Sequence, residues 1–175
     1  EPDVVGIQAF SCDFGLLQEF VTILRRQMPE VTLIMGGPHP SGVKEIVFTH
    51  YPELDYAFAG EGEKGLKLFL QELEKPEPTL SHIPGLIYRT DDGKILTNQV
   101  AAEEDIDQWG QPAWDLMDPR TYPHAPHQAV VKEFPVAPII ATRGCPFKCT
   151  FCSVLTITGR KPRYRDVVKV VDEIE

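Results

Sequence analysis

Hydrophobic and polar positions follow two different periods along the first half of the chain. Apolar runs at residues 4–10, 31–37 and 55–60 predict three buried strands. Between the first two runs, apolar residues recur at steps of three and four, which predicts a helix with one buried face. The members of that face are Phe14, Leu17, Val21, Leu24 and Met28.

Two further helices are expected to follow the second and third strands. The first is shorter and covers about residues 43–49, and the second begins after the segment "EGE". The buried face of the second helix is expected to hold Leu66, Phe69, Leu70 and Leu73. Strands that alternate with helices predict a parallel, doubly wound α/β sheet. Ligands of such sheets bind beyond the carboxyl ends of the strands, where the glycines of this chain fall.

The pattern changes after residue 80. The segments 85–89 and 94–98 flank "TDDG" and predict a β-hairpin. Recurrent prolines from 106 to 138 prevent continuous helix or sheet and predict an ordered linker. Its expected apolar anchors are Trp109, Trp114, Leu116, Met117 and Tyr122. A new strand is expected at 137–144, and Asp166 is expected to cap a helix.

These patterns divide the chain into three expected parts. They are a doubly wound α/β domain at 1–80, the hairpin and proline-rich linker at 81–137, and the first strand–helix unit of a second domain at 138–175. Because the first residues run directly into a strand pattern and the last ones into a helical pattern, both domains are expected to be truncated.

Charge and hydropathy narrow the class of protein. A formal net charge of −9 over 175 residues argues against a general nucleic-acid or membrane-surface binder. No apolar run approaches the roughly 18 residues that cross a bilayer, and the first residues do not form a signal peptide. A cytoplasmic protein is therefore expected, in which clustered cysteines indicate metal or redox chemistry rather than disulfides.

The segment "ATRGCPFKCTFC" holds three of the four cysteines, Cys145, Cys149 and Cys152. A disulfide would leave one of the three unpaired. A structural zinc ion needs four ligands, and without a second cysteine pair the fourth would have to come from His124 or His127. Thiolates also hold iron–sulfur clusters, and three ligands from one loop would leave one iron open to a substrate or cofactor.

"RGCPFKCTFC" resembles the signature loop of the radical S-adenosylmethionine enzymes, with Phe151 in the aromatic position before the last cysteine. The resemblance implies that Cys145, Cys149 and Cys152 hold an oxygen-sensitive [4Fe-4S] cluster and that S-adenosylmethionine chelates its fourth iron. It also implies that the loop follows the first strand of a (βα) barrel, at the end where barrel active sites lie.

Six basic residues surround this loop in an acidic chain. They are either ordinary solvated surface or a local positive field that favours the cluster and anionic groups of a cofactor or substrate. They are Arg143, Lys148, Arg160, Lys161, Arg163 and Arg165.

Nearly the whole chain resembles the cobalamin-binding radical S-adenosylmethionine enzymes, among them the anaerobic magnesium-protoporphyrin monomethyl ester cyclases. The segments "PDVVGIQAF", "IMGGPHPS", "DYAFAGEGE", "IPGLIYRTDDGKI", "PAWDLMD" and "RGCPFKCTFCS" occur in that family's order. The resemblance implies a Rossmann-like first domain in which cobalamin lies across the carboxyl ends of the strands.

The first cobalamin contacts implied by the family lie after the first two strands. Gln8 and Phe10 stand where cobalamin folds often carry a Ser-x-Leu element, and Gln8 or Ser11 is expected to donate a hydrogen bond. Gly36 and Gly37 match the paired glycines past which the nucleotide tail of cobalamin runs, so a Cβ at either is expected to clash with the tail.

Gly60, Glu61 and Gly62 match the loop after the third strand and complete the expected cofactor contacts. His39, between two prolines, is expected to hydrogen-bond locally rather than to ligate cobalt. Cys12 is expected to be a small buried residue beside a strand end.

The expected function is reductive cleavage of S-adenosylmethionine to a 5′-deoxyadenosyl radical, which drives methylation or oxidative cyclisation of an unreactive carbon. A tetrapyrrole-like or lipid-like small substrate and an electron donor such as flavodoxin or ferredoxin are the expected partners, with no nucleic acid. The alternatives are a transfer-RNA methylthiotransferase, whose first domain would hold three more cysteines where this chain has only Cys12, and a non-catalytic cobalamin- or zinc-binding regulatory module.

Overall fold

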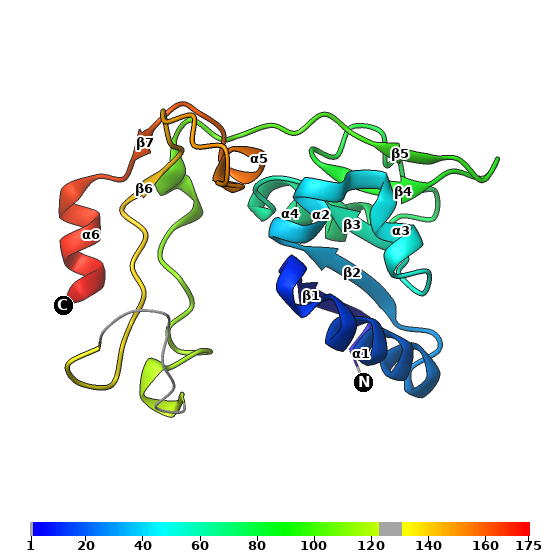
Figure 1. The fold of residues 1–175 in the computed structure, drawn as a ribbon, viewed down its shortest axis with the longest axis horizontal. Helices are drawn as coiled ribbons and strands as arrows, with labels where there is room; N and C mark the ends of the chain where they lie inside the picture. Colours follow the sequence, from blue (N-terminus) through cyan, green and yellow to red (C-terminus); the bar gives the residue numbers. More distant parts are fainter. Residues whose placement is uncertain (1, 123–130) are drawn as a thin grey trace. The chain divides into compact units, whose positions relative to one another are not determined.

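The computed structural model describes residues 2–122 and 131–175. The chain forms two compact units (Figure 1). The sheet unit comprises residues 1–103 and 144–161, and the linker unit comprises residues 104–143 and 162–175. His124 and His127, considered above as zinc ligands, lie outside the described residues.

A five-stranded sheet forms the centre of the sheet unit (Figure 1). Its strands follow one another in space as they do in sequence: β1 (Val4–Gln8), β2 (Thr32–Gly36), β3 (Tyr56–Phe58), β4 (Leu86–Arg89) and β5 (Ile95–Thr97). The first three strands are parallel, as predicted, whereas β4 and β5 are antiparallel. The predicted hairpin therefore forms, and it extends this sheet rather than standing with the linker.

Helices cover both faces of the sheet. One face carries α1 (Phe14–Gln27) and α3 (Val47–His50), and the other carries α4 (Glu63–Leu73). The short helix expected over about 43–49 is replaced by α2 (Pro38–Val43), a 3₁₀ turn and α3. The helical segment begins earlier because Pro38 takes the first helical position, where a missing backbone N–H costs nothing.

The core confirms the predicted buried face of α1. Only part of the predicted face of α4 is buried. Val21 is fully buried, and Phe14, Leu17, Leu24 and Met28 pack around it against the sheet. On α4, Phe69 is fully buried, whereas Leu66 and Leu70 are 36% and 41% exposed. The helical period was therefore predicted correctly, but half of the α4 stripe does not reach the core.

The linker unit contains η3 (Ile106–Trp109), η4 (Pro119–Thr121), β6 (Thr142–Arg143), β7 (Arg163–Tyr164) and α6 (Val167–Ile174). Asp166 caps α6 as predicted, because its carboxylate accepts from the backbone N–H of Val168 at 2.8 Å. The expected strand over 137–144 is reduced to β6, which pairs antiparallel with β7.

Some expectations about this unit are wrong. Leu116 and Met117 are 80% and 63% exposed, so they do not anchor the linker. Arg165 is not part of a free positive field, since its guanidinium lies 3.3 Å from Asp107 Oδ1 and 2.5 Å from Glu173 Oε2. These pairs tie η3 to both ends of α6 and give Arg165 a structural role.

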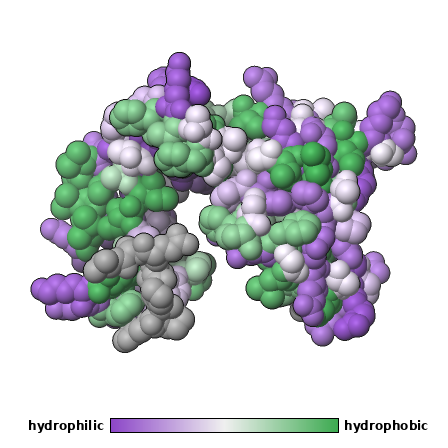
Figure 2. All heavy atoms as spheres, viewed as in Figure 1, coloured by the Kyte–Doolittle hydropathy of each residue, from purple (hydrophilic) through white to green (hydrophobic). Residues whose placement is uncertain are grey.

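The apolar side chains of α6 gather on the surface of the linker unit in Figure 2. Val167, Val168, Val171 and Ile174 are all exposed. Across the two described ranges, none of the helices has the length and apolar character that a bilayer crossing requires.

Candidate functional site

An open hollow of about 220 Å³ lies at the carboxyl ends of β1, β2 and β3. Four of the expected cofactor contacts line it, namely Gln8, Gly36, Gly37 and Gly62. Its apolar wall includes Ile34, Phe58 and Leu66. Leu66 is thus only partly covered because it faces this hollow, and the sheet has the ligand-binding edge that the strand order predicts.

The carboxyl edge of the sheet carries four glycines, and we call it the glycine edge. They are Gly36, Gly37, Gly60 and Gly62, and they are of two kinds. A Cβ added at Gly36 or Gly62 would meet no atom within 4 Å, although both residues line the hollow. A side chain there would enter the space that a ligand would occupy. Gly36 and Gly62 therefore form the part of the backbone that a ligand can approach closely.

Gly37 and Gly60 are instead required by the protein itself. Gly37 has a φ of +99°, and a Cβ would lie 3.1 Å from the carbonyl oxygen of Ala9. Gly60 has a φ of +82°, and a Cβ would lie 2.4 Å from Val100. Such positive φ angles are strained for any residue with a Cβ, so these two glycines are explained without a ligand.

A buried serine that sequence reasoning missed joins the two glycine loops. Ser41 is 3% exposed, and its hydroxyl donates to the carbonyl oxygen of Gly37 at 2.7 Å. The same hydroxyl accepts from the backbone N–H of Gly60 at 3.0 Å. The serine of "GGPHPS" could be seen in the sequence, but its hydrogen bond could not be predicted, because the partner Gly60 lies nineteen positions further along the chain. The loops after β2 and β3 are therefore held as one edge.

His39 is hydrogen-bonded through both ring nitrogens, but its partners lie far along the chain rather than locally as expected. Its ring is 4% exposed, with Nδ1 at 3.0 Å from Ser11 Oγ and Nε2 at 3.0 Å from His50 Nδ1. Burial first, and the neighbouring charge of His50 second, lower the pKa of His39 below its usual value. Because both ring nitrogens are engaged, His39 is not poised as a cobalt ligand. Ser11 is the outermost of these three hydrogen-bonded side chains and lies at the surface beyond β1. It does not line the hollow.

Cys12 is exposed rather than buried. It lies in the single 3₁₀ turn η1 (Ser11–Asp13) that follows β1, where the backbone has left the sheet and carries its side chain into solvent.

The cysteine loop belongs to the sheet unit. Its backbone is closed by a hydrogen bond from Cys145 N to Gly159 O at 3.1 Å and tightened by one from Cys152 N to Cys149 O at 3.3 Å. It leads into α5 (Val154–Ile157), whose Cα atoms lie within 8 Å of those of α2. Gly37 is the N-cap residue of α2, so α5, which follows the cysteine loop, lies close to the glycine edge.

The loop's side chains are mostly solvent-exposed. Phe151 is 90% exposed and Phe147 is 71% exposed, while Cys149 is exposed and the other two cysteines are half-buried. Within residues 2–122 and 131–175, no three His, Cys, Asp or Glu side chains are gathered closely enough to hold a metal ion. The donor set nevertheless suits an iron–sulfur cluster, because it offers three thiols on one short, hydrogen-bonded loop. Phe151 as a cofactor contact remains a prediction.

Comparison with known proteins defines the class of the sheet unit. Residues 1–70 match the B12 binding domain family. Structures with the same fold include the radical S-adenosylmethionine methyltransferase TsrM of Kitasatospora setae, with cobalamin and a [4Fe-4S] cluster bound. It has a TM-score of 0.70 at 20% identity, over 99% of this chain and 35% of the other. The Rossmann-like, cobalamin-binding type of fold is confirmed.

The whole chain also has sequence relatives. It is 29% identical, over its full length and 31% of the relative, to the anaerobic magnesium-protoporphyrin IX monomethyl ester cyclase of Rubrivivax gelatinosus. It is 27% identical, over 99% of its length and 36% of the relative, to the cytidylyl-2-hydroxyethylphosphonate methyltransferase of Streptomyces wedmorensis. The chain is thus a relative of the cobalamin-binding radical S-adenosylmethionine enzymes, and it spans about a third of the curated relatives it matches.

Proposed function

We propose that this chain is the cobalamin-binding and cluster-binding part of a radical S-adenosylmethionine enzyme that methylates or oxidatively cyclises an unreactive carbon. One observation carries the proposal. The ligand-accessible edge at Gly36 and Gly62 and the loop of Cys145, Cys149 and Cys152 belong to the same compact unit. A corrin cofactor and a cluster held there would both serve one reaction centre.

The three cysteines would hold a [4Fe-4S] cluster and leave one iron for S-adenosylmethionine. When bound, these two groups supply a 5′-deoxyadenosyl radical, and cobalamin supplies a transferable methyl group. The chain's own contribution is to bring the thiols together on one loop. Phe151 would cover part of the cluster and limit the access of water and oxygen to it.

The sheet edge would bind cobalamin through close backbone approach and hydrogen bonding. Gly36 and Gly62 leave space for the nucleotide tail, and the exposed amide of Gln8 would orient it. Ile34, Phe58 and Leu66 would exclude water from the tail. Gly37 and Gly60 would act indirectly by setting the course of the two loops, and Glu61 would line the cofactor's path between them.

The relatives suggest both reaction types, since one is named a cyclase and another a methyltransferase. Anaerobic turnover of the full-length enzyme with a strong reductant separates the two. A methylase consumes two molecules of S-adenosylmethionine per product and releases both 5′-deoxyadenosine and S-adenosylhomocysteine. A cyclase releases 5′-deoxyadenosine alone. Substrate conversion that does not respond to added cobalamin would contradict the assignment of the first domain.

The same proposal includes a cytoplasmic location, a flavodoxin- or ferredoxin-like electron donor and a small substrate of tetrapyrrole-like or lipid-like character. An electron donor is needed because cleavage of the sulfonium bond consumes one electron. A zinc-binding regulatory module is the rival, and metal analysis of anaerobically purified protein distinguishes them: iron with sulfide supports the enzyme, and zinc alone supports the module.

A further inference from the structure

The segment that carries the three cysteines belongs to the sheet unit, whereas its neighbours along the chain do not. Residues 144–161, which we call the cysteine segment, are part of the sheet unit, while residues 104–143 and 162–175 form the linker unit. The cysteine segment comprises the cysteine loop and α5. Contacts with the sheet and its loops therefore hold this segment in place, and α5 makes them on the side of α2.

Gly60, in the loop after β3, lies directly beside the backbone of α5. A Cβ built at Gly60 would lie 3.7 Å from the carbonyl oxygen of Ile157, the last residue of α5, and 2.4 Å from Cγ1 of Val100. The first distance is an ordinary van der Waals contact, and the second is an overlap. Gly60 therefore occupies a narrow space between α5 and the segment after β5, where a residue without a side chain lets two backbones approach each other.

The position of Gly60 is in turn fixed by Ser41. The buried Ser41 hydroxyl accepts from the backbone N–H of Gly60 at 3.0 Å and donates to the carbonyl oxygen of Gly37 at 2.7 Å. The backbone N–H of Ser41 also donates to the Gly37 carbonyl oxygen, at 3.3 Å. Because these groups are shielded from water, loss of the hydroxyl would leave the Gly60 N–H without its partner. Ser41 thus ties the contact point of α5 to the glycine edge.

The end of α5 also closes the base of the cysteine loop. Gly159 follows Ile157 by two residues, and its carbonyl oxygen accepts from the N–H of Cys145 at 3.1 Å. The tip of the loop has no such support, since Cys149 is exposed and the Phe151 side chain is 90% exposed. The position of the loop is therefore set at its base, where it meets α5 and Gly60.

We propose that Ser41 and Gly60 are positioning residues for the cysteine loop. The end of α5 rests on the bare backbone of Gly60, and the Ser41 hydroxyl keeps that backbone in place, so that Cys145 is held in a fixed position relative to the glycine edge. The positioning is a property of the protein without cofactors. Its purpose rests on the proposed function, because it would bring a cluster and cobalamin to one reaction centre.

The positioning is tested by hydrogen–deuterium exchange of the full-length protein without cofactors, followed at the amide of Cys145. Ser41→Ala removes the hydroxyl and adds no atom, so the loop base should open more often and exchange at Cys145 should be about tenfold faster, as expected for one buried hydrogen bond. Gly60→Ala should act in the same direction, because its methyl group overlaps Val100 and displaces the contact point of α5. In Gly60→Ala/Val100→Ala the nearest atom of residue 100 lies 3.6 Å away, and exchange should slow again.

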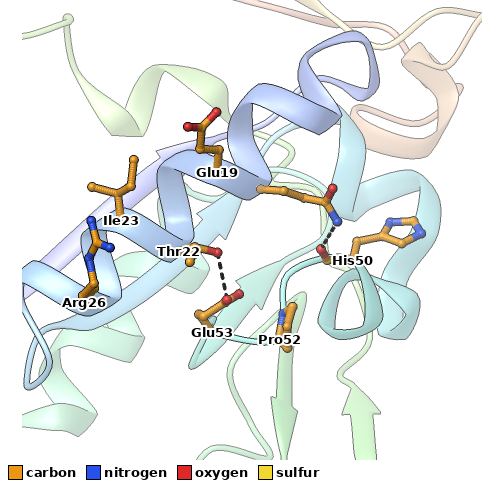
Figure 3. Close-up of a pocket in the computed structure, with 8 residues that line it drawn as sticks. Glu19, Thr22, Ile23, Arg26, His50, Pro52 and Glu53 are labelled. Carbon is orange, nitrogen blue, oxygen red and sulfur yellow. Dashed lines mark hydrogen bonds between the residues drawn. The ribbon is translucent and has the colours of Figure 1, made fainter.

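Two control variants lie away from the cysteine segment. Thr22 donates to Glu53 Oε1 at 2.9 Å in a groove of about 380 Å³ between α1 and the segment after α3 (Figure 3). Thr22→Ala removes that hydrogen bond and should leave exchange at Cys145 unchanged. Gly93 has a φ of +79°, and a Cβ there would meet no atom of the described residues within 4 Å. Gly93→Ala therefore brings the backbone strain of Gly60→Ala without its overlap, and should also leave Cys145 unchanged.

A third control separates positioning from general stability. Val21 is fully buried in the core under α1, so Val21→Ala lowers the urea midpoint of the whole unit. Exchange at Cys145 proceeds through local opening of the loop base, which this substitution does not touch, and should keep its wild-type rate.

The purpose of the positioning is tested by the rate at which reconstituted [4Fe-4S] cluster loses iron to a chelator under anaerobic conditions, without cobalamin. Ser41→Ala and Gly60→Ala should lose iron several-fold faster than the wild type, in proportion to their exchange at Cys145. Gly62→Ala, whose methyl group enters the hollow and meets no described atom within 4 Å, should lose iron at the wild-type rate.

The outcomes are distinguishable. Exchange at Cys145 that is unchanged in Ser41→Ala, or that rises as much in Val21→Ala, overturns the positioning. Faster exchange combined with unchanged iron loss overturns its purpose and leaves the proposed function intact. A wild type that shows the expected exchange pattern but binds no iron overturns the proposed function, while the contact between Gly60 and α5 still stands.

Discussion

The glycine edge of the sheet and the cysteine loop differ in how firmly contacts within the protein fix their conformations. The edge is held by a buried core, by the Ser41 hydroxyl and by backbone angles that only glycine adopts easily. The loop is closed by two backbone hydrogen bonds, and its aromatic side chains lie in solvent. One site is formed before its ligand arrives, whereas the other is expected to take its final form around its cluster.

The largest effect that tests this comparison is loss of the cluster. Replacing Cys145, Cys149 or Cys152 by Ala should each reduce bound iron from about four atoms per chain to nearly none, because a [4Fe-4S] cluster on this loop has no spare thiolate. Iron and sulfide are measured after anaerobic reconstitution, together with the brown absorbance of the cluster. Cys12→Ala is the matched control and should keep full iron content. A complete cluster in the Cys149 variant would remove the basis of the assignment.

The next effect separates the two kinds of glycine. Gly37→Ala should destabilise the protein by about 1–2 kcal/mol or more, because it places a Cβ at positive φ against the backbone of Ala9. Gly36→Ala meets no atom within 4 Å and should leave stability nearly unchanged. Urea unfolding midpoints measure both.

The same two substitutions are expected to show the opposite order in their effect on cobalamin affinity, once the affinity is corrected for the folded fraction of each variant. Gly36→Ala should weaken hydroxocobalamin binding by at least about tenfold, as expected for a steric clash worth about 1.4 kcal/mol. If Gly36→Ala binds hydroxocobalamin as tightly as the wild type, then Gly36 serves only to end a strand. The proposal that a ligand closely approaches this backbone would then be wrong.

The smallest effect is the pH dependence of stability that His39 confers. Its pKa is lowered in the folded protein, so the unfolded chain binds more protons as pH falls. Stability should be complete above the ordinary histidine pKa of about 6.5 and should be lost progressively below it. One proton contributes at most about 1.4 kcal/mol per pH unit. His39→Gln should show a shallower fall in Tm between about pH 7.5 and 5.5, and an unchanged slope would show that other groups dominate.

Sequence periodicity was sufficient for the parallel strands, the buried face of α1 and the sheet edge that carries the glycines. It was insufficient wherever the answer depends on a contact through space. Gly36 and Gly37 are neighbours with the same letter, yet only one of them has a positive φ and a backbone atom in the way. Leu66 has the helical spacing of a core residue, but the sheet leaves a hollow opposite it.

The polar interactions were hidden from sequence for the same reason. Ser11, His39 and His50 are separated by 28 and 11 positions along the chain, and no local pattern links them. The helix at Pro38 was not predicted, because prolines interrupt the interior of a helix, whereas the first turn of a helix accepts them. The cysteine spacing, in contrast, is itself the chemical signal, so the candidate cluster ligands were visible from the sequence alone.

The Ser41 hydroxyl has a consequence for how this edge can change over evolutionary time. It donates to a carbonyl of one glycine loop and accepts from an N–H of the other, so one side chain links the two loops. A replacement at position 41 that keeps only the donor or only the acceptor would release one of them. The loops are therefore expected to be inherited and exchanged between relatives as a pair, and a graft of either loop alone into another scaffold should lose its shape.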